Sequence, residues 1–203
     1  HHPIELDIQL LADGTLVVFH DTELERMTGR SGTIGDQTLS SLKNCRLLGT
    51  AEPIPTLAET LALISGRVPV LIEIKNEGDV GELEAALLKQ VQDYDGEFAI
   101  QSFNPFSLQW FKERSPHIQR GQLSGNFKGE DLVWHKKLLL GNLLLNSLSS
   151  PNFVAYDLRA LPNVPTTVSR RLFNLPLLPW TVRNEAQREK AAQWADNYIF
   201  DAF

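Results

Sequence analysis

Residues 3–21 read PIELDIQLLADGTLVVFHD, and this stretch decides the fold that we expect for the chain. Apolar and polar side chains alternate along IELDIQL, and this period of two puts Glu5 and Asp7 on one face of a strand. About five residues, among them an Asp-Gly pair, separate this strand from LVVFH at 16–20. Such a short connection has no room for a helix and predicts a hairpin turn. The second strand is therefore expected to run back along the first and to bring His20 towards Glu5 and Asp7.

The composition is typical of a globular protein with a sizeable core. The chain has 203 residues, of which 42% are hydrophobic and 22% charged, and we expect a single domain over residues 1–203. The formal net charge of −6 argues against a nucleic-acid-binding protein, which usually carries a basic patch. There is one cysteine, Cys45, so no disulfide can form within the chain, and we expect Cys45 to be a small buried apolar residue.

Strand patterns alternate with helix patterns along the rest of the chain. Strands are expected at 4–10, 68–75, 97–103, 118–123, 153–158, 175–182 and 197–201, and helices at 56–65, 79–94, 104–116 and 184–195. Such alternation implies parallel neighbours joined by right-handed crossovers. A closed (β/α)₈ barrel needs one more strand than this. We therefore predict an α/β fold, a (β/α)₈ barrel without its first strand–helix unit and its final helix, with an open α/β sheet as the alternative.

Two other segments have distinct patterns. The segment at about 22–56 is long and rich in Gly and Thr, and it has a helical pattern only around 38–44. Loops of this length in compact domains are usually functional, so we interpret it as a small insertion. The apolar run LLLGNLLLNSL at 138–148 is shorter than the roughly 20 residues that span a bilayer. We expect no stable membrane insertion and interpret the run as a buried helix or turn region.

Three carboxylates and one lysine lie on two of the expected strands, at 4–10 and 68–75. In VLIEIK, the period of two puts Glu73 and Lys75 on one face, as it does for Glu5 and Asp7. Both faces of a parallel barrel sheet are covered, so inward carboxylates need either raised pKa values or a bound cation. Three carboxylates suit a hard divalent ion, Mg²⁺ or Ca²⁺, better than zinc. The alternatives are a plain polar strand face, a surface ion pair of Lys75, and a simple turn at His20.

The order of these pieces matches one family. The matching pieces are Glu5-Leu6-Asp7, Asp13-Gly14, His20-Asp21, Arg26-Met27-Thr28-Gly29, Ile54-Pro55-Thr56-Leu57 with Glu59, Glu73-Ile74-Lys75, Ser102-Phe103, Trp180-Thr181-Val182 and Asp201. With this set the chain resembles the glycerophosphodiester phosphodiesterases from residue 3 to its end, most closely up to residue 103. The family's opening His-Arg-Gly strand and Glu-Asn-Thr segment have no counterpart, and we expect them upstream of Pro3.

The resemblance implies a barrel with its site at the carboxyl-terminal rim and assigns roles to six residues. Glu5, Asp7 and Glu73 match the family's metal ligands, and His20 matches one of its two catalytic histidines. The match for a phosphate-contacting lysine is Lys75. The remaining match is Trp180, an aromatic residue in the wall of the substrate pocket.

The implied activity is the metal-dependent hydrolysis of glycerophosphodiesters to glycerol 3-phosphate and an alcohol by general acid/base catalysis. It implies one divalent cation, Mg²⁺ or Ca²⁺, and a small-molecule substrate. The alternatives are a non-catalytic barrel that binds a phosphodiester and a related phosphodiesterase that acts on lysophospholipids. The single cysteine and the acidic pI favour a cytoplasmic protein, and the oligomeric state stays open.

Overall fold

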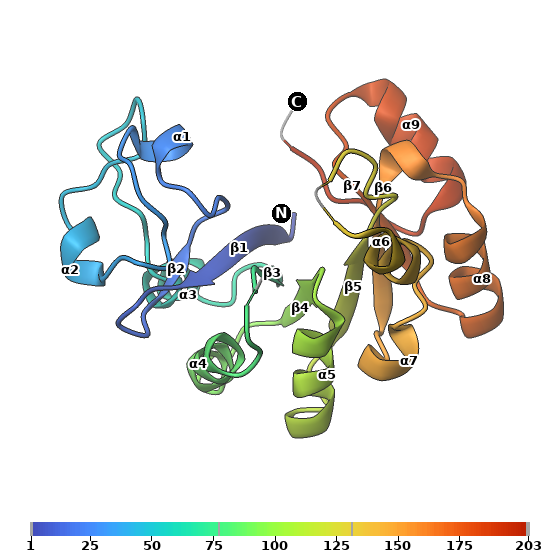
Figure 1. Cartoon of the computed structure of the whole chain (residues 1–203), viewed down its shortest axis with the longest axis horizontal. Coiled ribbons are helices and arrows are strands. Elements are labelled where there is room, and N and C mark those ends of the chain that lie inside the picture. The colour runs from blue at the N-terminus through green and yellow to red at the C-terminus, as the bar shows by residue number, and fades with distance from the viewer. Residues whose placement is uncertain (1, 77, 131, 202–203) are drawn as a thin grey trace. The chain divides into compact units, whose positions relative to one another are not determined.

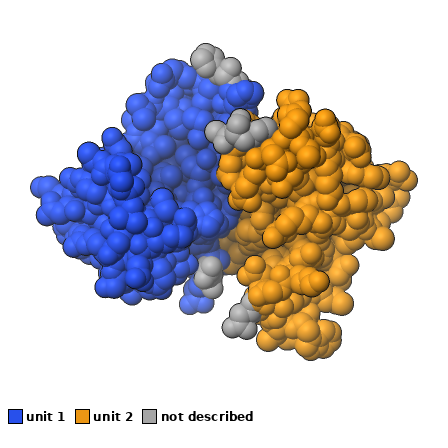
Figure 2. Space-filling model, turned by 90° about the horizontal axis from the view of Figure 1, so that it is seen from above, with its two compact units in different colours: residues 1–100 blue, residues 101–203 orange. Residues whose placement is uncertain are grey.

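The computed structural model describes residues 2–76, 78–130 and 132–201. The chain divides into two compact units, His1–Ile100 and Gln101–Phe203 (Figure 2), and each is described by itself. Our expectation of a single domain over residues 1–203 stays a prediction.

The first unit is built on three hydrogen-bonded strands, β1 (Ile4–Leu10), β2 (Leu16–Val18) and β3 (Val70–Ile74). Strand β1 lies between the other two, antiparallel to β2 and parallel to β3. The hairpin predicted from the short connection is therefore confirmed. A backbone hydrogen bond from Phe19 N to the carbonyl oxygen of Asp7 (3.0 Å) continues the pairing beyond β2. It brings the chain at His20 alongside Asp7.

Four helices belong to this unit: α1 (Glu25–Thr28), α2 (Leu39–Leu42), α3 (Leu57–Ile64) and α4 (Glu82–Val91). Helix α3 follows the predicted pattern, with Leu57, Leu61 and Ile64 buried. Its first turn is a capping box in which Thr56 and Glu59 each accept a hydrogen bond from the other's backbone N–H, as the sequence indicates. This pair fixes where α3 begins.

The segment at about 22–56 shares a small apolar core with the hairpin of β1 and β2, although the sequence predicts little regular structure there. The core consists of Leu11, Val17, Phe19, Leu24, Ile34, Leu42, Cys45 and Ile54, with Met27 and Leu47 packed against it. Cys45 is fully buried in this cluster, as expected for a small apolar residue. The carboxyl-terminal end of the segment meets β2: Thr56 forms an isolated bridge with Val17, and Val18 N donates to the carbonyl oxygen of Pro55 (2.9 Å).

The second unit is built on the parallel strands β5, β6 and β7 (Figure 1). Their bounds are Arg120–Ser124, Phe153–Asp157 and Leu177–Trp180, and strand β4 (Phe98–Ser102) crosses the boundary between the units. The helices of this unit are α5 (Pro105–Arg114), α6 (Trp134–Gly141), α7 (Asn146–Ser149), α8 (Val164–Phe173) and α9 (Glu185–Trp194), with a 3₁₀ turn η1 at Leu158–Ala160. Strand and helix alternate with parallel neighbours, so the α/β prediction of a partial (β/α)₈ barrel is confirmed.

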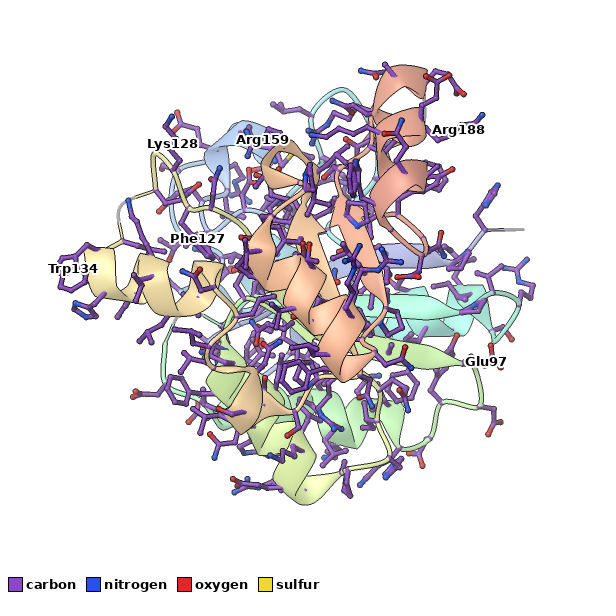
Figure 3. The ribbon with its side chains drawn as sticks, turned by 90° about the vertical axis from the view of Figure 1, so that its right-hand side faces the viewer. Glu97, Phe127, Lys128, Trp134, Arg159 and Arg188 are labelled. Carbon is purple, nitrogen blue, oxygen red and sulfur yellow. The ribbon has the colours of Figure 1, made fainter. Side chains whose placement is uncertain are left out.

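Two expectations for this unit differ from the structure. The strand predicted at 197–201 is reduced to one parallel bridge, Val182 with Phe200, flanked by hydrogen bonds that include Val182 N to the carbonyl oxygen of Ile199 (2.9 Å). The run at 138–148 forms helix and turn as expected, but Leu138 and Leu144 are 50% and 54% exposed rather than buried. At the start of α6, Trp134 projects away from the helix (Figure 3). Among the described residues, no helix is long and apolar enough to cross a membrane.

Candidate active site

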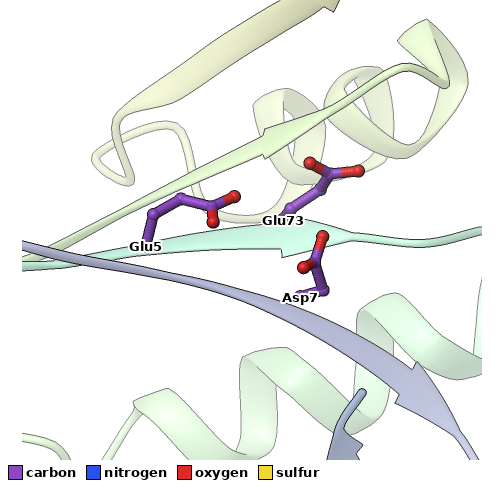
Figure 4. Close-up of side chains that lie close together, drawn as sticks. All are labelled: Glu5, Asp7 and Glu73. Carbon is purple, nitrogen blue, oxygen red and sulfur yellow. The ribbon is translucent and has the colours of Figure 1, made fainter. Parts of the chain in front are cut away.

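Three carboxylates converge on neighbouring strands of the first unit. Glu5 and Asp7 extend from β1 and Glu73 from β3, and one carboxylate oxygen of each lies within 4.8 Å of the others (Figure 4). The parallel register pairs Asp7 with Glu73, which explains why residues far apart in sequence meet. The period of two along each strand places all three side chains on one face. The structure thus brings together the carboxylates that the sequence predicts to converge.

Lys75 lies among these carboxylates rather than on the surface. Its Nζ is 2.6 Å from Oε1 of Glu73 and 3.1 Å from Oδ1 of Asp7. Burial would lower the pKa of Lys75, but the charges of Glu73 and Asp7 outweigh that effect and raise it. Lys75 is therefore a fixed positive charge next to the acidic cluster.

Glu73 is the most strongly buried of the candidate ligands, with 6% of its surface exposed. Burial raises the pKa of Glu73, and the nearby charge of Asp7 adds to this, while Lys75 opposes it. Oε1 of Glu73 is buried and, apart from its ion pair with Lys75, accepts no hydrogen bond from the described residues. The ammonium of Lys75 shows that this oxygen favours a positively charged partner, as a metal ligand would.

The spacing of the three carboxylates fits a hard divalent ion. Two oxygens on opposite sides of Ca²⁺ lie about 4.8 Å apart, and about 4.2 Å apart for Mg²⁺, given usual metal–oxygen distances. Because the candidate oxygens lie within 4.8 Å of one another, they need little movement to share one ion. Oxygen-only ligands favour Mg²⁺ or Ca²⁺ over zinc.

His20 lies at the end of the hairpin with its imidazole exposed and held at one nitrogen. Its Nδ1 is 2.7 Å from Oδ1 of Asp21, and Arg26 binds the same carboxylate through Nε and Nη2. The Arg26 guanidinium and the His20 ring hold the pKa of Asp21 down at about 2. Asp21 is therefore ionised at neutral pH and accepts the hydrogen bond, so Nδ1 of His20 carries the proton. Nε2 is then the nitrogen available to exchange a proton.

Gln9 fixes the backbone on both sides of His20. Its side-chain Nε2 donates to the carbonyl oxygens of Phe19 (3.1 Å) and Asp21 (2.7 Å). Gln9 is 8% exposed and follows Glu5 and Asp7 on the same face of β1. The strand that carries two carboxylates thus also holds the backbone at the histidine.

An open hollow of about 480 Å³ is lined by Gln9, His20, Asp21, Thr22, Glu23 and Lys75. It connects the histidine to the lysine of the acidic cluster within the first unit. A larger hollow of about 1080 Å³ in the same unit, lined by residues that include Thr56, Ala62 and Tyr94, contains none of the six predicted site residues. The smaller hollow is the better candidate for the active site, because two of the predicted site residues, His20 and Lys75, line it.

Trp180 ends strand β7 in the second unit. The indole of Trp180 packs edge-on against Phe103, with ring centroids 5.6 Å apart, and the ring of Phe127 also packs against Phe103, at 6.1 Å. Nε1 of Trp180 is buried and makes no hydrogen bond with the described residues. The aromatic rings pack together at the end of β7, and the expected place of Trp180 in a substrate pocket stays a prediction.

The sequence interpretation missed the roles of Gln9, Asp21 and Arg26 around His20. Gln9 had a signal, because it continues the period of two from Glu5 and Asp7. Asp21 and Arg26 stand in two of the pieces that match the family, but their ion pair could not be predicted, because it depends on how the chain turns through α1.

Comparison with known proteins assigns the family. Residues 2–203 match the model of the glycerophosphoryl diester phosphodiesterase family. The chain belongs to this family. It is 32% identical to a glycerophosphodiester phosphodiesterase from Caldanaerobacter subterraneus subsp. tengcongensis, covering 92% of this chain and 76% of that one. For a glycerophosphodiester phosphodiesterase of Bacillus subtilis the identity is 27%, over 97% of this chain and 72% of the relative.

The chain is also similar in structure to a phosphodiesterase from Oleispira antarctica in complex with the product sn-glycerol-3-phosphate. The TM-score is 0.80 at 25% identity, over 98% of this chain and 81% of that one. A crystal structure of a glycerophosphodiester phosphodiesterase from Thermotoga maritima, at 24% identity and a TM-score of 0.72, has the same fold. As a member of the glycerophosphoryl diester phosphodiesterase family, the chain is a phosphoric diester hydrolase with a (β/α)₈-type fold.

Proposed function

We propose that this phosphodiesterase hydrolyses glycerophosphodiesters to glycerol 3-phosphate and an alcohol, using a divalent cation held by Glu5, Asp7 and Glu73. The observation that carries the proposal is the convergence of these carboxylates within 4.8 Å. Such an ion, when bound, offsets negative charge at a phosphoryl oxygen as the phosphorus is attacked. Mg²⁺ and Ca²⁺ both suit the oxygen ligands.

Lys75 contacts the phosphoryl group in this proposal. Its ammonium lies 2.6 Å from Glu73, so a phosphoryl oxygen drawn to the acidic cluster by a cation also meets this positive charge. The raised pKa keeps Lys75 charged throughout the neutral range. A point charge at this position stabilises the additional negative charge of the transition state.

His20 transfers a proton at Nε2. The hydrogen bond to Asp21 keeps the proton on Nδ1 and orients the ring. The free nitrogen can take a proton from the attacking oxygen or give one to the leaving alkoxide. Trp180 contributes an apolar wall for the substrate, which is supported by its packing against Phe103.

Two measurements test the proposal. Calorimetric titration with Mg²⁺ and with Ca²⁺ should show one bound ion per chain. Release of glycerol 3-phosphate from glycerophosphocholine should stop in EDTA and return when the ion is restored. Full turnover in EDTA would remove the metal role, while ion binding without turnover of glycerophosphocholine or lysophosphatidylcholine would favour the non-catalytic alternative. Faster turnover of lysophosphatidylcholine would favour the lysophospholipid alternative.

A further inference from the structure

A second hollow lies within the second unit at the carboxyl ends of two neighbouring strands. It has a volume of about 290 Å³ and is lined by Asp157, Leu158, Arg159, Trp180, Thr181, Arg183, Gln187 and Lys190. Asp157 ends β6 and Trp180 ends β7, and the two residues are paired in the parallel register. The carboxyl ends of the strands are where barrels of this kind bind their ligands.

The lining of this hollow is positively charged, although the protein as a whole is acidic. The lining includes three cationic residues, Arg159, Arg183 and Lys190, and one carboxylate residue, Asp157. The chain has a net charge of −6, so this local excess of positive charge runs against the overall composition. Asp157 pairs with Arg159 and Asp201 pairs with Arg183, whereas Lys190 has no acidic partner among the described residues, and such an unbalanced charge attracts an anion.

Each cation keeps donors that its present partners do not use. Asp157 accepts from Nε and Nη2 of Arg159, and Asp201 accepts from Nε of Arg183 (2.7 Å). Nη1 of Arg159 and both terminal nitrogens of Arg183 therefore make no hydrogen bond with the described residues. Lys190 donates to the neutral carbonyl oxygen of Leu158 (2.8 Å), which leaves its charge unbalanced.

We propose that this hollow is an anion-binding site that takes the carboxylate or phosphate group of a small molecule. Arginine forks match the paired oxygens of these groups, and the flexible lysine adds a point charge. The volume suits one such group with its neighbouring atoms rather than a whole large ligand. A positively charged alcohol, such as choline, is disfavoured at this site by Arg159, Arg183 and Lys190.

The anionic group has two possible sources with the same chemistry. One is a glycerophosphodiester whose alcohol carries the anionic group, in which case the inference rests on the proposed function. The other is a free anion that binds independently of the substrate. Phosphate titration and a comparison of two substrates separate these sources.

The first measurement is calorimetric titration with inorganic phosphate in EDTA, which needs no catalytic activity. Arg183→Gln and Lys190→Gln are the test variants, since the ion-pair partner of Arg183, Asp201, is exposed. Arg188→Gln is the matched control, because Arg188 is an exposed arginine of α9 that also has an acidic partner, Glu185, and lies outside the lining (Figure 3). We expect phosphate binding to weaken about tenfold or more in each test variant, as for loss of a charged hydrogen bond, and to be unchanged in the control. Undetectable phosphate binding in the unmodified protein, or equal weakening in all three variants, would overturn the site.

The second measurement compares kcat/KM for glycerophosphoserine, whose alcohol carries a carboxylate, and for glycerophosphoglycerol, whose alcohol is uncharged. If the head group is the source, Arg183→Gln lowers kcat/KM about tenfold more for the first substrate than for the second. If a free anion is the source, the two substrates respond equally and added phosphate changes the rate in the unmodified protein but not in Arg183→Gln. Phosphate binding that depends on Arg183, in a protein that turns over neither substrate, would reject the proposed function and leave the anion site standing.

Discussion

Nε2 of Gln9 lies 2.7 Å from the carbonyl oxygen of Asp21, so the strand with the acidic cluster also fixes the hairpin end at His20. The same nitrogen donates to the carbonyl oxygen of Phe19. Backbone carbonyls on both sides of His20 are thereby tied to β1. The position of the imidazole thus depends on one amide side chain that does not itself exchange protons.

Replacing Gln9 by leucine should lower kcat more than it changes KM. The change removes both hydrogen bonds to the backbone at His20, and an unsatisfied buried carbonyl costs about 1–3 kcal/mol. Steady-state kinetics with glycerophosphocholine and urea unfolding measure the two effects. Gln109→Leu is the control, because Gln109 pairs with Glu113 on α5 in the second unit. A Gln9→Leu enzyme with unchanged kcat would show that His20 is positioned by other contacts.

Replacing His20 by alanine should reduce turnover by about 10²–10⁴-fold, the usual contribution of a general acid or base. The fold should survive, because the imidazole is exposed and its hydrogen-bond partner among the described residues is the neighbouring Asp21. Activity and circular dichroism check the two parts of this prediction. His135→Ala, at an exposed position on α6, is the control and should keep full activity. Turnover of His20→Ala within a few-fold of the unmodified enzyme would remove His20 from the mechanism.

Asp21 should make stability depend on acid pH in a defined window. The pKa of Asp21 is about 2 in the folded protein against an ordinary value of 3.8. A lowered folded-state pKa means that the ionised group stabilises the fold above pH 3.8 and that this contribution is lost as the pH falls towards 2. Urea unfolding at a series of pH values should show this loss in the unmodified protein and a flatter profile in Asp21→Asn. Equal slopes in the two proteins would contradict the interpretation.

Replacing Glu73 by glutamine should abolish binding of one divalent ion, because it removes the buried ligand of the acidic cluster. In the unmodified protein, affinity for the ion should fall as the pH is lowered, and this fall should begin at a higher pH than at an ordinary glutamate, since the raised pKa of Glu73 lets protons compete earlier. Calorimetry with Mg²⁺ and Ca²⁺ measures both effects. Glu82→Gln, on the exposed start of α4, is the control. Ion binding that survives Glu73→Gln would place the metal elsewhere.

Replacing Lys75 by methionine should destabilise the metal-free protein and make its stability more dependent on a divalent ion. Without the ammonium, Asp7 and Glu73 face each other with no counter-charge, and removing one partner of a buried pair is costly. Thermal unfolding with and without Ca²⁺ tests this, with Lys89→Met on the exposed face of α4 as the control. If added Ca²⁺ raises the unfolding temperatures of the Lys75→Met and Lys89→Met proteins equally, Lys75 does not neutralise Asp7 and Glu73.

Much of the first unit could be predicted from local pattern. The capping box of α3 and the alternation in β1 and β3 are local signals that the structure keeps. The parallel register then brings Asp7 opposite Glu73 without any further information. These are positions where local preference and tertiary packing agree.

Helix α8 could not be predicted in the same way, because its apolar residues face outward. Val164, Val168 and Leu172 are 76%, 37% and 76% exposed, whereas the small polar residues Thr166 and Ser169 are buried. The usual link between apolar periodicity and a buried face is therefore reversed. The contact of Arg26 with Asp21 likewise has no sequence pattern, since it depends on the path of the chain through the insertion.

The segment at about 22–56 rejoins the fold at one short strand, β2, through Val17–Thr56 and Val18–Pro55 contacts. Its apolar cluster includes Leu11, Val17 and Phe19 of the hairpin, so a change in the length or core of this segment would be felt directly by the strands that carry the acidic cluster. Because His20 lies just before this segment, such a change would also alter the surroundings of the imidazole.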